Sequence, residues 1–163
     1  MKHNYLNKLE DYLGIILVFG LAFLLAIQVI FRYVFSHPLG WTEELARYVF
    51  IWMIFVGAVI VSREREHVRI ELLKTFVPEK AWQFLTFLNE LCIFVFWVFL
   101  IPAAFKYAFF AINIDASGSG ISMFFVFISL PICGLLIGIH TIINMVKDFK
   151  KIIEKENNTV TSI

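Results

Sequence analysis

The sequence predicts an all-α integral membrane protein with four transmembrane helices and a short cytoplasmic amphipathic helix at the membrane interface. Of the 163 residues, 60% are hydrophobic and 17% are charged, whereas soluble domains average about half apolar and about a quarter charged residues. The mean hydropathy is +0.82, and the apolar residues gather in four long runs. This composition excludes a water-soluble globule, and we expect one membrane domain over residues 1–163.

The first span is expected at about residues 12–32. Residues 12–31 contain no Asp, Glu, Lys or Arg, and about 20 such residues match a hydrocarbon core about 30 Å thick. This run is longer than the apolar region of a usual signal peptide, and no small-residue cleavage site precedes Arg32. We therefore expect the span to be retained.

The second span is expected at about residues 42–63. Its uncharged run, residues 48–62, is short by itself. Thr42 is predicted to be the N-cap, because its hydroxyl suits the unpaired backbone N–H groups of a first turn. Glu43 and Glu44 then fall in that turn, where the helix dipole favours acidic side chains.

The third and fourth spans are expected at about residues 81–105 and 122–146. Only Glu90 interrupts the third. The last apolar run, residues 116–146, is too long for one span, and the Ser-Gly-Ser-Gly stretch at residues 117–120 is typical of a turn. This turn places the start of the fourth helix near residue 122.

Lysine and arginine positions predict that both termini are cytoplasmic. Eleven of the 14 Lys and Arg residues lie in the N-terminal segment, the connector between the second and third spans, or the C-terminal tail. The other three are Arg32, Arg47 and Lys106, near the alternate loops. Since positive residues collect in cytoplasmic loops, this distribution predicts the orientation N-in and C-in.

The cytoplasmic connector contains an amphipathic segment at about residues 67–77. Its apolar side chains recur at helical spacing, opposite its charged side chains, and Pro78 follows it. This pattern predicts a short helix that lies flat on the cytoplasmic interface.

The sequence offers no catalytic constellation. Of the four histidines, only His140 lies inside a predicted span, so facing histidine ligands for a haem are not available. The sequence contains no HExxH, no GxSxG and no phosphate-binding glycine loop. We expect no enzyme activity, no cofactor and no metal site. The net charge of +1 without a basic stripe also argues against nucleic acid as a partner.

Glu90 and His140 are ionisable residues inside predicted spans, so they are functional candidates. At 1.5 Å per residue they lie roughly 13 Å and roughly 9 Å from the cytoplasmic ends of their spans, and the two side chains can meet at similar depth. One interpretation is that they hold helices or a partner subunit together. The alternative is a self-sufficient small transporter or channel that uses both residues, although a proton relay normally needs a longer chain.

Two clusters at the membrane boundaries are further candidates. On the outer side, Arg47 lies three and four residues after Glu44 and Glu43, so both acids are expected to pair with it. On the inner side, arginines suit lipid headgroups or the acidic edge of a partner. The candidates for structural, subunit or lipid contacts are Arg32, Trp41, Glu43, Glu44, Arg47, Tyr48, Arg63, His67, Glu90 and His140.

Several stretches resemble a known family. They are Gln-Val-Ile-Phe-Arg-Tyr-Val-Phe at 28–35, Pro-Leu-Gly-Trp-Thr-Glu-Glu-Leu-Ala-Arg-Tyr at 38–48, Gly-Ala at 57–58, Arg63, His67 and Ile-Glu-Leu-Leu at 70–73. Over residues 12–77 the chain resembles the small membrane subunit, DctQ-like, of tripartite ATP-independent periplasmic (TRAP) transporters. The length of four spans and the predicted orientation agree with this resemblance.

The resemblance implies a bacterial inner-membrane system that imports organic acids with a sodium gradient. A periplasmic substrate-binding protein delivers the substrate, and a large multi-span subunit carries the substrate and sodium sites. The small subunit is then a non-catalytic scaffold for the large subunit and helps to form the docking surface for the binding protein. Sialic acid and C4-dicarboxylates both remain open as substrates, with the sequence most similar to small subunits of sialic-acid systems.

Docking contacts follow from the same resemblance, and lipid contacts follow from the charges at the inner membrane boundary. The outer loops, at about residues 36–39 and 106–120, are expected to take part in docking. The docking candidates are His37, Lys106 and Asp115. Phospholipids are expected partners because the inner rim is basic.

Overall fold

The computed structural model describes residues 5–37, 39–64 and 78–160, and the regular elements in this part of the chain are helices. The elements are α1 (Tyr5–Tyr33), α2 (Gly40–Glu64), α4 (Glu79–Phe110), the 3-10 helix η1 (Ala111–Asn113), α5 (Phe124–Phe127) and α6 (Ser129–Val160). Four of the described segments are long and apolar enough to cross a membrane, as predicted. The expected interfacial helix at residues 67–77 lies outside the described residues.

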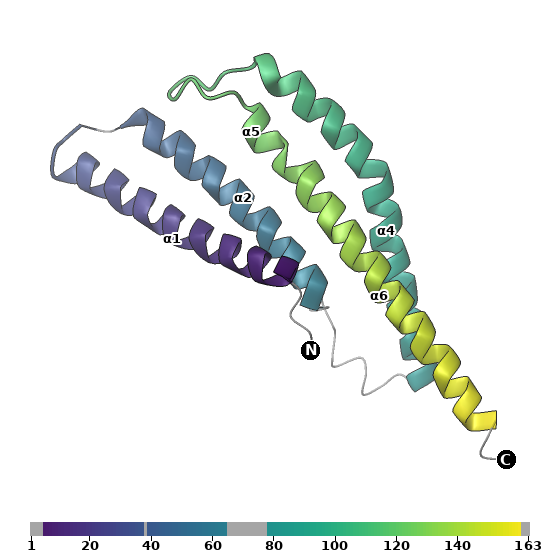
Figure 1. The fold of residues 1–163 in the computed structure, drawn as a ribbon. Coiled ribbons are helices and arrows are strands. Elements are labelled where there is room, and N and C mark those ends of the chain that lie inside the picture. The colour runs from purple at the N-terminus through teal and green to yellow at the C-terminus, as the bar shows by residue number, and fades with distance from the viewer. Residues whose placement is uncertain (1–4, 38, 65–77, 161–163) are drawn as a thin grey trace.

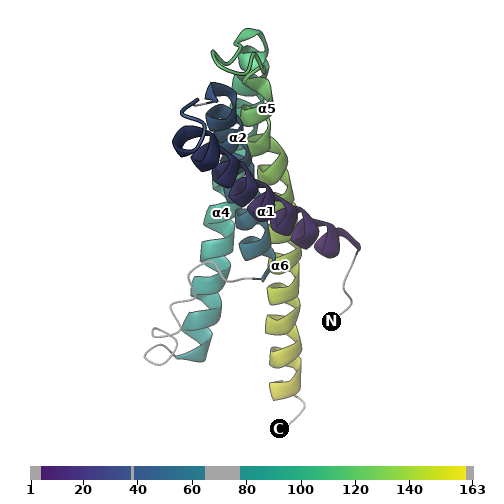
Figure 2. The same cartoon turned by 90° about the vertical axis from the view of Figure 1, so that its left-hand side faces the viewer.

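The helices form two antiparallel hairpins that lie side by side. Helix α1 packs on α2, α4 packs on α6, and α2 packs on α6 between the hairpins, so the order in space is α1, α2, α6, α4 (Figure 1). Turned by 90°, the molecule is much narrower (Figure 2). We call the end with the start of α1 and the end of α2 the inner end, and the end with residues 34–39 and 111–123 the outer end.

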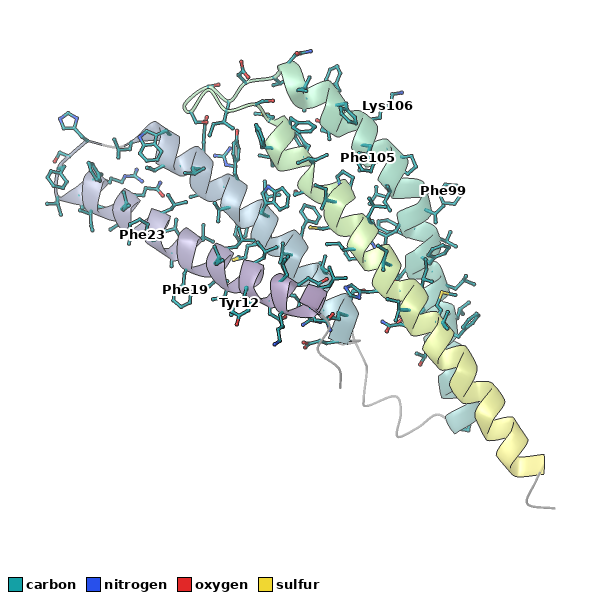
Figure 3. The ribbon with its side chains drawn as sticks, viewed as in Figure 1. Tyr12, Phe19, Phe23, Phe99, Phe105 and Lys106 are labelled. Atoms are coloured by element: carbon teal, nitrogen blue, oxygen red, sulfur yellow. The ribbon has the colours of Figure 1, made fainter. Side chains whose placement is uncertain are left out.

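This row has two central helices and two flanking ones. In the most apolar 18-residue window of each span, none of α1 and 6% of α4 is buried, against 22% of α2 and 44% of α6. Large apolar side chains on α1, such as Phe19 and Phe23, and Phe99 on α4, are exposed and point away from the row (Figure 3). These two helices therefore present broad apolar surfaces to lipid or to another membrane protein.

The core lies between α2 and α6. Its buried residues are Val56 and Val59 on α2 and Cys133 and Ile137 on α6. The two buried residues are three positions apart on α2 and four positions apart on α6. Residues at these spacings lie on one face of a helix, as expected for packed helices.

Helix α4 approaches α6 closely at one glycine. A Cβ atom built on Gly134 would lie 2.6 Å from Cε3 of the Trp97 indole ring, closer than real atoms approach. Gly134 is buried, and Trp97 packs against the core. The absence of a side chain at this position is therefore what lets the indole ring rest on the α6 backbone.

The structure corrects the start of α2. The helix begins at Gly40, and Thr42 lies inside its first turn instead of serving as the N-cap. The Thr42 hydroxyl donates a hydrogen bond to the Leu39 carbonyl oxygen at 2.7 Å and the residue is fully buried. A threonine hydroxyl can bind a preceding carbonyl as readily as a free N–H group, and here the carbonyl is the partner.

The fourth span is interrupted near its outer end. Pro131 has no N–H group to continue the backbone ladder, and the span is divided into α5 and α6 at Ile128. The Ser129 hydroxyl binds the Val126 carbonyl at 2.6 Å. This bond gives the Val126 carbonyl oxygen a partner, which in a continuous helix would be a backbone N–H group.

A side chain of α2 also binds this break. The Trp52 indole N–H donates to the Phe125 carbonyl oxygen at 2.8 Å. We expect Trp52→Phe to lower the free energy of unfolding by about 1 kcal/mol, because the carbonyl loses its donor in an apolar surrounding. Unfolding in detergent measures this loss, and Trp41→Phe at a 45% exposed site is the control. Equal losses in the two variants would contradict a specific role for the bond.

Candidate functional site

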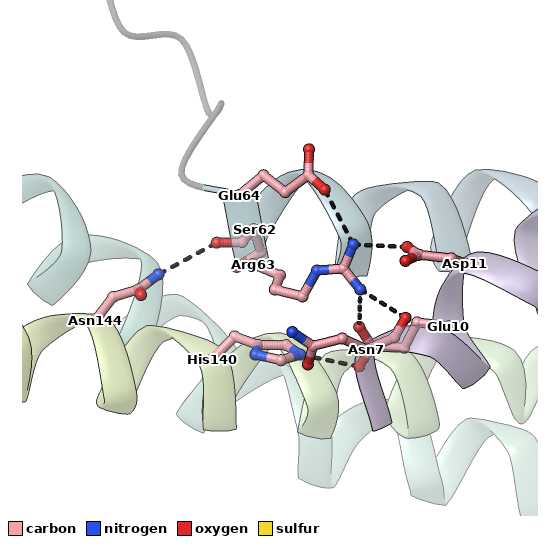
Figure 4. A network of polar contacts seen from close by, with 8 residues as sticks. All are labelled: Asn7, Glu10, Asp11, Ser62, Arg63, Glu64, His140 and Asn144. Carbon is pink, nitrogen blue, oxygen red and sulfur yellow. Dashed lines mark hydrogen bonds and ion pairs between the residues drawn. The ribbon is translucent and has the colours of Figure 1, made fainter. Parts of the chain in front are cut away.

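A group of polar residues at the inner end joins three helices. Glu10 on α1 is 6% exposed. Its Oε2 atom lies 3.1 Å from Arg63 Nη1 on α2, and its Oε1 atom lies 2.9 Å from His140 Nε2 on α6. The group, shown in Figure 4, is called the inner polar cluster here and comprises Asn7, Glu10, Asp11, Arg63, Glu64 and His140.

Arg63 is the centre of this cluster. Its Nη2 atom donates to Asp11 Oδ1 at 2.6 Å and to Glu64 Oε1 at 3.0 Å. Its Nη1 atom also donates to the Asn7 carbonyl oxygen at 2.9 Å. One guanidinium thus meets three carboxylates from two helices, with the forked geometry that arginine offers and lysine does not.

A second contact at the inner end links the two central helices. Asn144 Nδ2 on α6 donates to the Ser62 carbonyl oxygen on α2 at 3.2 Å, and both residues are buried. Together with the inner polar cluster, this bond fixes the position of α6 relative to α2.

The structure places His140 against Glu10. His140 Nε2 lies 2.9 Å from Glu10 Oε1, and Glu90 lies half-buried on α4. The expectation that Glu90 and His140 meet stays a prediction. His67, another candidate, lies outside the described residues.

A polar contact at the outer end joins α2 to the segment before α5. Glu44 Oε1 accepts a hydrogen bond from the Gly118 backbone N–H at 2.8 Å. Glu44 Oε2 accepts from the Ser119 N–H at 2.7 Å and from the Ser119 hydroxyl at 2.8 Å. The buried Tyr48 hydroxyl, one turn further along α2, lies near Ser119.

The expected pairing of Arg47 with Glu43 and Glu44 is supplemented by a contact that the spacing did not predict. The Glu44 carboxylate hydrogen-bonds the loop, and the charge of Arg47 still acts on Glu44. The pairing of Arg47 with Glu43 stays a prediction. The outer-end candidates that are exposed are Arg32, His37, Trp41, Glu43, Arg47, Lys106 and Asp115.

One small cavity lies beside the inner polar cluster. This cavity of about 80 Å³ lies between α1, α2 and α6, with Glu10 and Leu136 among its lining residues. Pockets for small-molecule ligands usually measure about 300–1,000 Å³. Among the described residues no group of three or more His, Cys, Asp or Glu side chains is placed to bind a metal ion.

Comparison with known proteins identifies the family. The family model described as "Tripartite ATP-independent periplasmic transporters, DctQ component" matches residues 21–151. The chain belongs to the DctQ family. This match confirms the resemblance seen in the sequence, and with four membrane-type helices it makes the chain a multi-pass membrane protein of a transporter permease family, which is not a class of enzymes.

Three relatives illustrate the DctQ likeness. The chain is 39% identical over 137 residues to the sialic acid TRAP transporter permease protein SiaT of Haemophilus influenzae, which covers 82% of this chain but only 22% of SiaT. It is 29% identical to the sialic acid TRAP transporter small permease protein SiaQ of Vibrio cholerae, with 83% of this chain and 78% of SiaQ covered. A putative TRAP transporter small permease protein of Haemophilus influenzae is 22% identical, with 93% and 92% covered.

Proposed function

We propose that this chain is the non-catalytic small subunit of a sodium-coupled, binding-protein-dependent TRAP transporter that imports an organic acid of the sialic-acid class. The observation that carries the proposal is the DctQ match over residues 21–151. The 39% identity to SiaT favours sialic acid over C4-dicarboxylates, for which the identity to a small permease protein of Vibrio cholerae is 22%.

The geometry of the helix row supports an accessory role. A cavity of about 80 Å³ is too small for a sugar acid, since ligand pockets usually measure about 300 Å³ or more. The exposed apolar faces of α1 and α4 suit contact with a larger membrane subunit, which would hold the substrate and sodium sites. SiaT supports this division, because this chain corresponds to 22% of its length.

The proposed setting is the bacterial inner membrane with both termini in the cytoplasm. The inner end then carries the inner polar cluster, and the outer end, with His37, Lys106 and Asp115, faces the periplasm. These three exposed side chains are proposed to contribute to docking of the binding protein, and phospholipids and the large subunit are proposed to cover the flanking helices. No cofactor is proposed for this chain.

Reconstitution tests the proposal. We expect proteoliposomes with this chain alone to show no sialic-acid uptake, and proteoliposomes with the chain, the large subunit and the binding protein to show uptake that requires an inward sodium gradient. Omission of each component in turn is the control. Uptake by this chain alone would overturn the accessory role and favour the self-sufficient transporter.

A charge-reversal series tests the docking role. We expect Lys106→Glu and Asp115→Lys to raise the concentration of binding protein needed for half-maximal uptake by roughly tenfold or less, because rim charges act mainly on association. The maximal uptake rate is expected to stay unchanged. Unaltered half-saturation in both variants would show that the large subunit docks the binding protein without these residues.

A further inference from the structure

The connection between α4 and α6 is a compact hairpin at the outer end. We call residues 114–123 the outer loop. Its two arms are joined by backbone hydrogen bonds from Met123 N–H to the Ile114 carbonyl at 2.9 Å and from Ala116 N–H to the Ile121 carbonyl at 3.0 Å. Gly120 closes the turn with φ of 66°, a conformation that residues other than glycine adopt with strain.

The tip of the outer loop is held from outside the hairpin. The N–H groups of Gly118 and Ser119 both point at the Glu44 carboxylate, and the Ser119 hydroxyl adds a third bond. Successive backbone N–H groups that converge on one carboxylate form an anion-binding nest. Hydrogen bonds to an ionised group are stronger than those between neutral groups. We therefore expect Glu44 to be the residue that holds the tip of the loop in place.

The fit between the two elements extends to the choice of residue at the tip. A Cβ atom built on Gly118 would lie 3.2 Å from Cδ and Oε1 of Glu44. A side chain at this position would push the carboxylate by a few tenths of an ångström. The backbone at position 118 thus lies in close contact with Glu44.

Glu44 also differs from its sequence neighbour. Glu43 is exposed, whereas Glu44 is half-buried against the loop. The side chains of Asp115 and Ser117 in the loop are exposed. The contact therefore fixes the backbone of the loop while its outer side chains stay free to meet another molecule.

We propose that Glu44 is a positioning residue, which holds the outer loop in one conformation so that the binding protein docks on a preformed surface. The inference rests on the proposed docking role of the outer end. A loop ordered in advance loses less conformational entropy when it is bound, so its affinity for a partner is higher.

The test uses the full complex with the large subunit and the binding protein. Glu44→Gln removes the charge, and Glu44→Ala removes all side-chain acceptors. Gly118→Ala disturbs the same contact from the loop side. Glu43→Gln, at the exposed neighbouring position on α2, is the matched control. Hydrogen exchange at the amides of Gly118 and Ser119 reports loop order, and titration with the binding protein reports docking.

We expect amide hydrogen exchange at the loop tip to be about tenfold faster in Glu44→Gln and faster still in Glu44→Ala. A tenfold ratio of exchange rates corresponds to the free energy of one charge-assisted hydrogen bond. The binding protein concentration for half-maximal uptake should rise in the same order, while the maximal rate and the yield of complex stay at the control level. A general loss of stability would lower the rate and the yield together.

Unchanged exchange in both Glu44 variants would overturn the inference, as would faster exchange with an unaltered half-saturation. Failure of the unmodified complex to bind the binding protein would contradict the proposed docking role itself, and this result is seen before any variant is made.

Discussion

Replacement of Arg63 with leucine is expected to lower the free energy of unfolding by about 3–5 kcal/mol, the usual cost of removing one partner from a buried ion pair. The Arg63 side chain is 11% exposed and that of Glu10 is 8% exposed. Without the guanidinium, the carboxylates of Glu10, Asp11 and Glu64 lose their shared donor at the inner end. Thermal unfolding of the purified chain in detergent measures the loss.

Two further variants make this result specific. Glu64→Gln is the matched control, since its side chain is 49% exposed and Arg63 keeps its other partners, so a change of about 1 kcal/mol or less is expected. The double variant Arg63→Leu with Glu10→Leu should recover part of the stability, because it also removes the buried carboxylate that has lost its arginine partner. A double variant as unstable as the sum of the two single ones would contradict this coupling.

The second large effect is expected at Gly134. Gly134→Ala should destabilise the chain by about 1–3 kcal/mol, the cost of overpacking, because the new methyl group would lie 2.6 Å from Cε3 of Trp97. Unfolding in detergent is again the measurement. Gly138→Ala, on the same helix with nothing within 4 Å of the new atom, is the control and should be neutral or slightly stabilising.

A second substitution tests the cause. Trp97→Leu removes the ring, so in that background Gly134→Ala should cost clearly less than in the unmodified chain. The same cost in both backgrounds would show that the indole ring is not what limits the residue at 134.

The four membrane helices could be predicted because their signal is local. Length and composition alone mark a segment that can span a hydrocarbon core, and the structure has four such helices. Helix ends were less predictable. Helix α1 begins at Tyr5, before the apolar run that starts at residue 12, because contact with Arg63 allows Glu10 and Asp11 to lie inside the helix.

The polar contacts depend on tertiary structure, which spacing does not reveal. Glu44 and Arg47 have the right separation for a helical pair, but the loop N–H groups, more than 70 residues further along the chain, reach the carboxylate. The Ser-Gly-Ser-Gly stretch could be predicted as a turn, but not its partner. Arg63 and His140 could be singled out as ionisable residues at or in the membrane, whereas their common partner Glu10 could not.

The arrangement of the helices in a row has a consequence for behaviour in the bilayer. With axes about 8–10 Å apart and helices about 10 Å across, four helices in a row make a body roughly 35–40 Å wide, where a closed bundle would be about half as wide. A row of helices of this width displaces lipid along its full width when it tilts in the membrane. A membrane protein bound to the side of this row resists tilting more than its own width would allow.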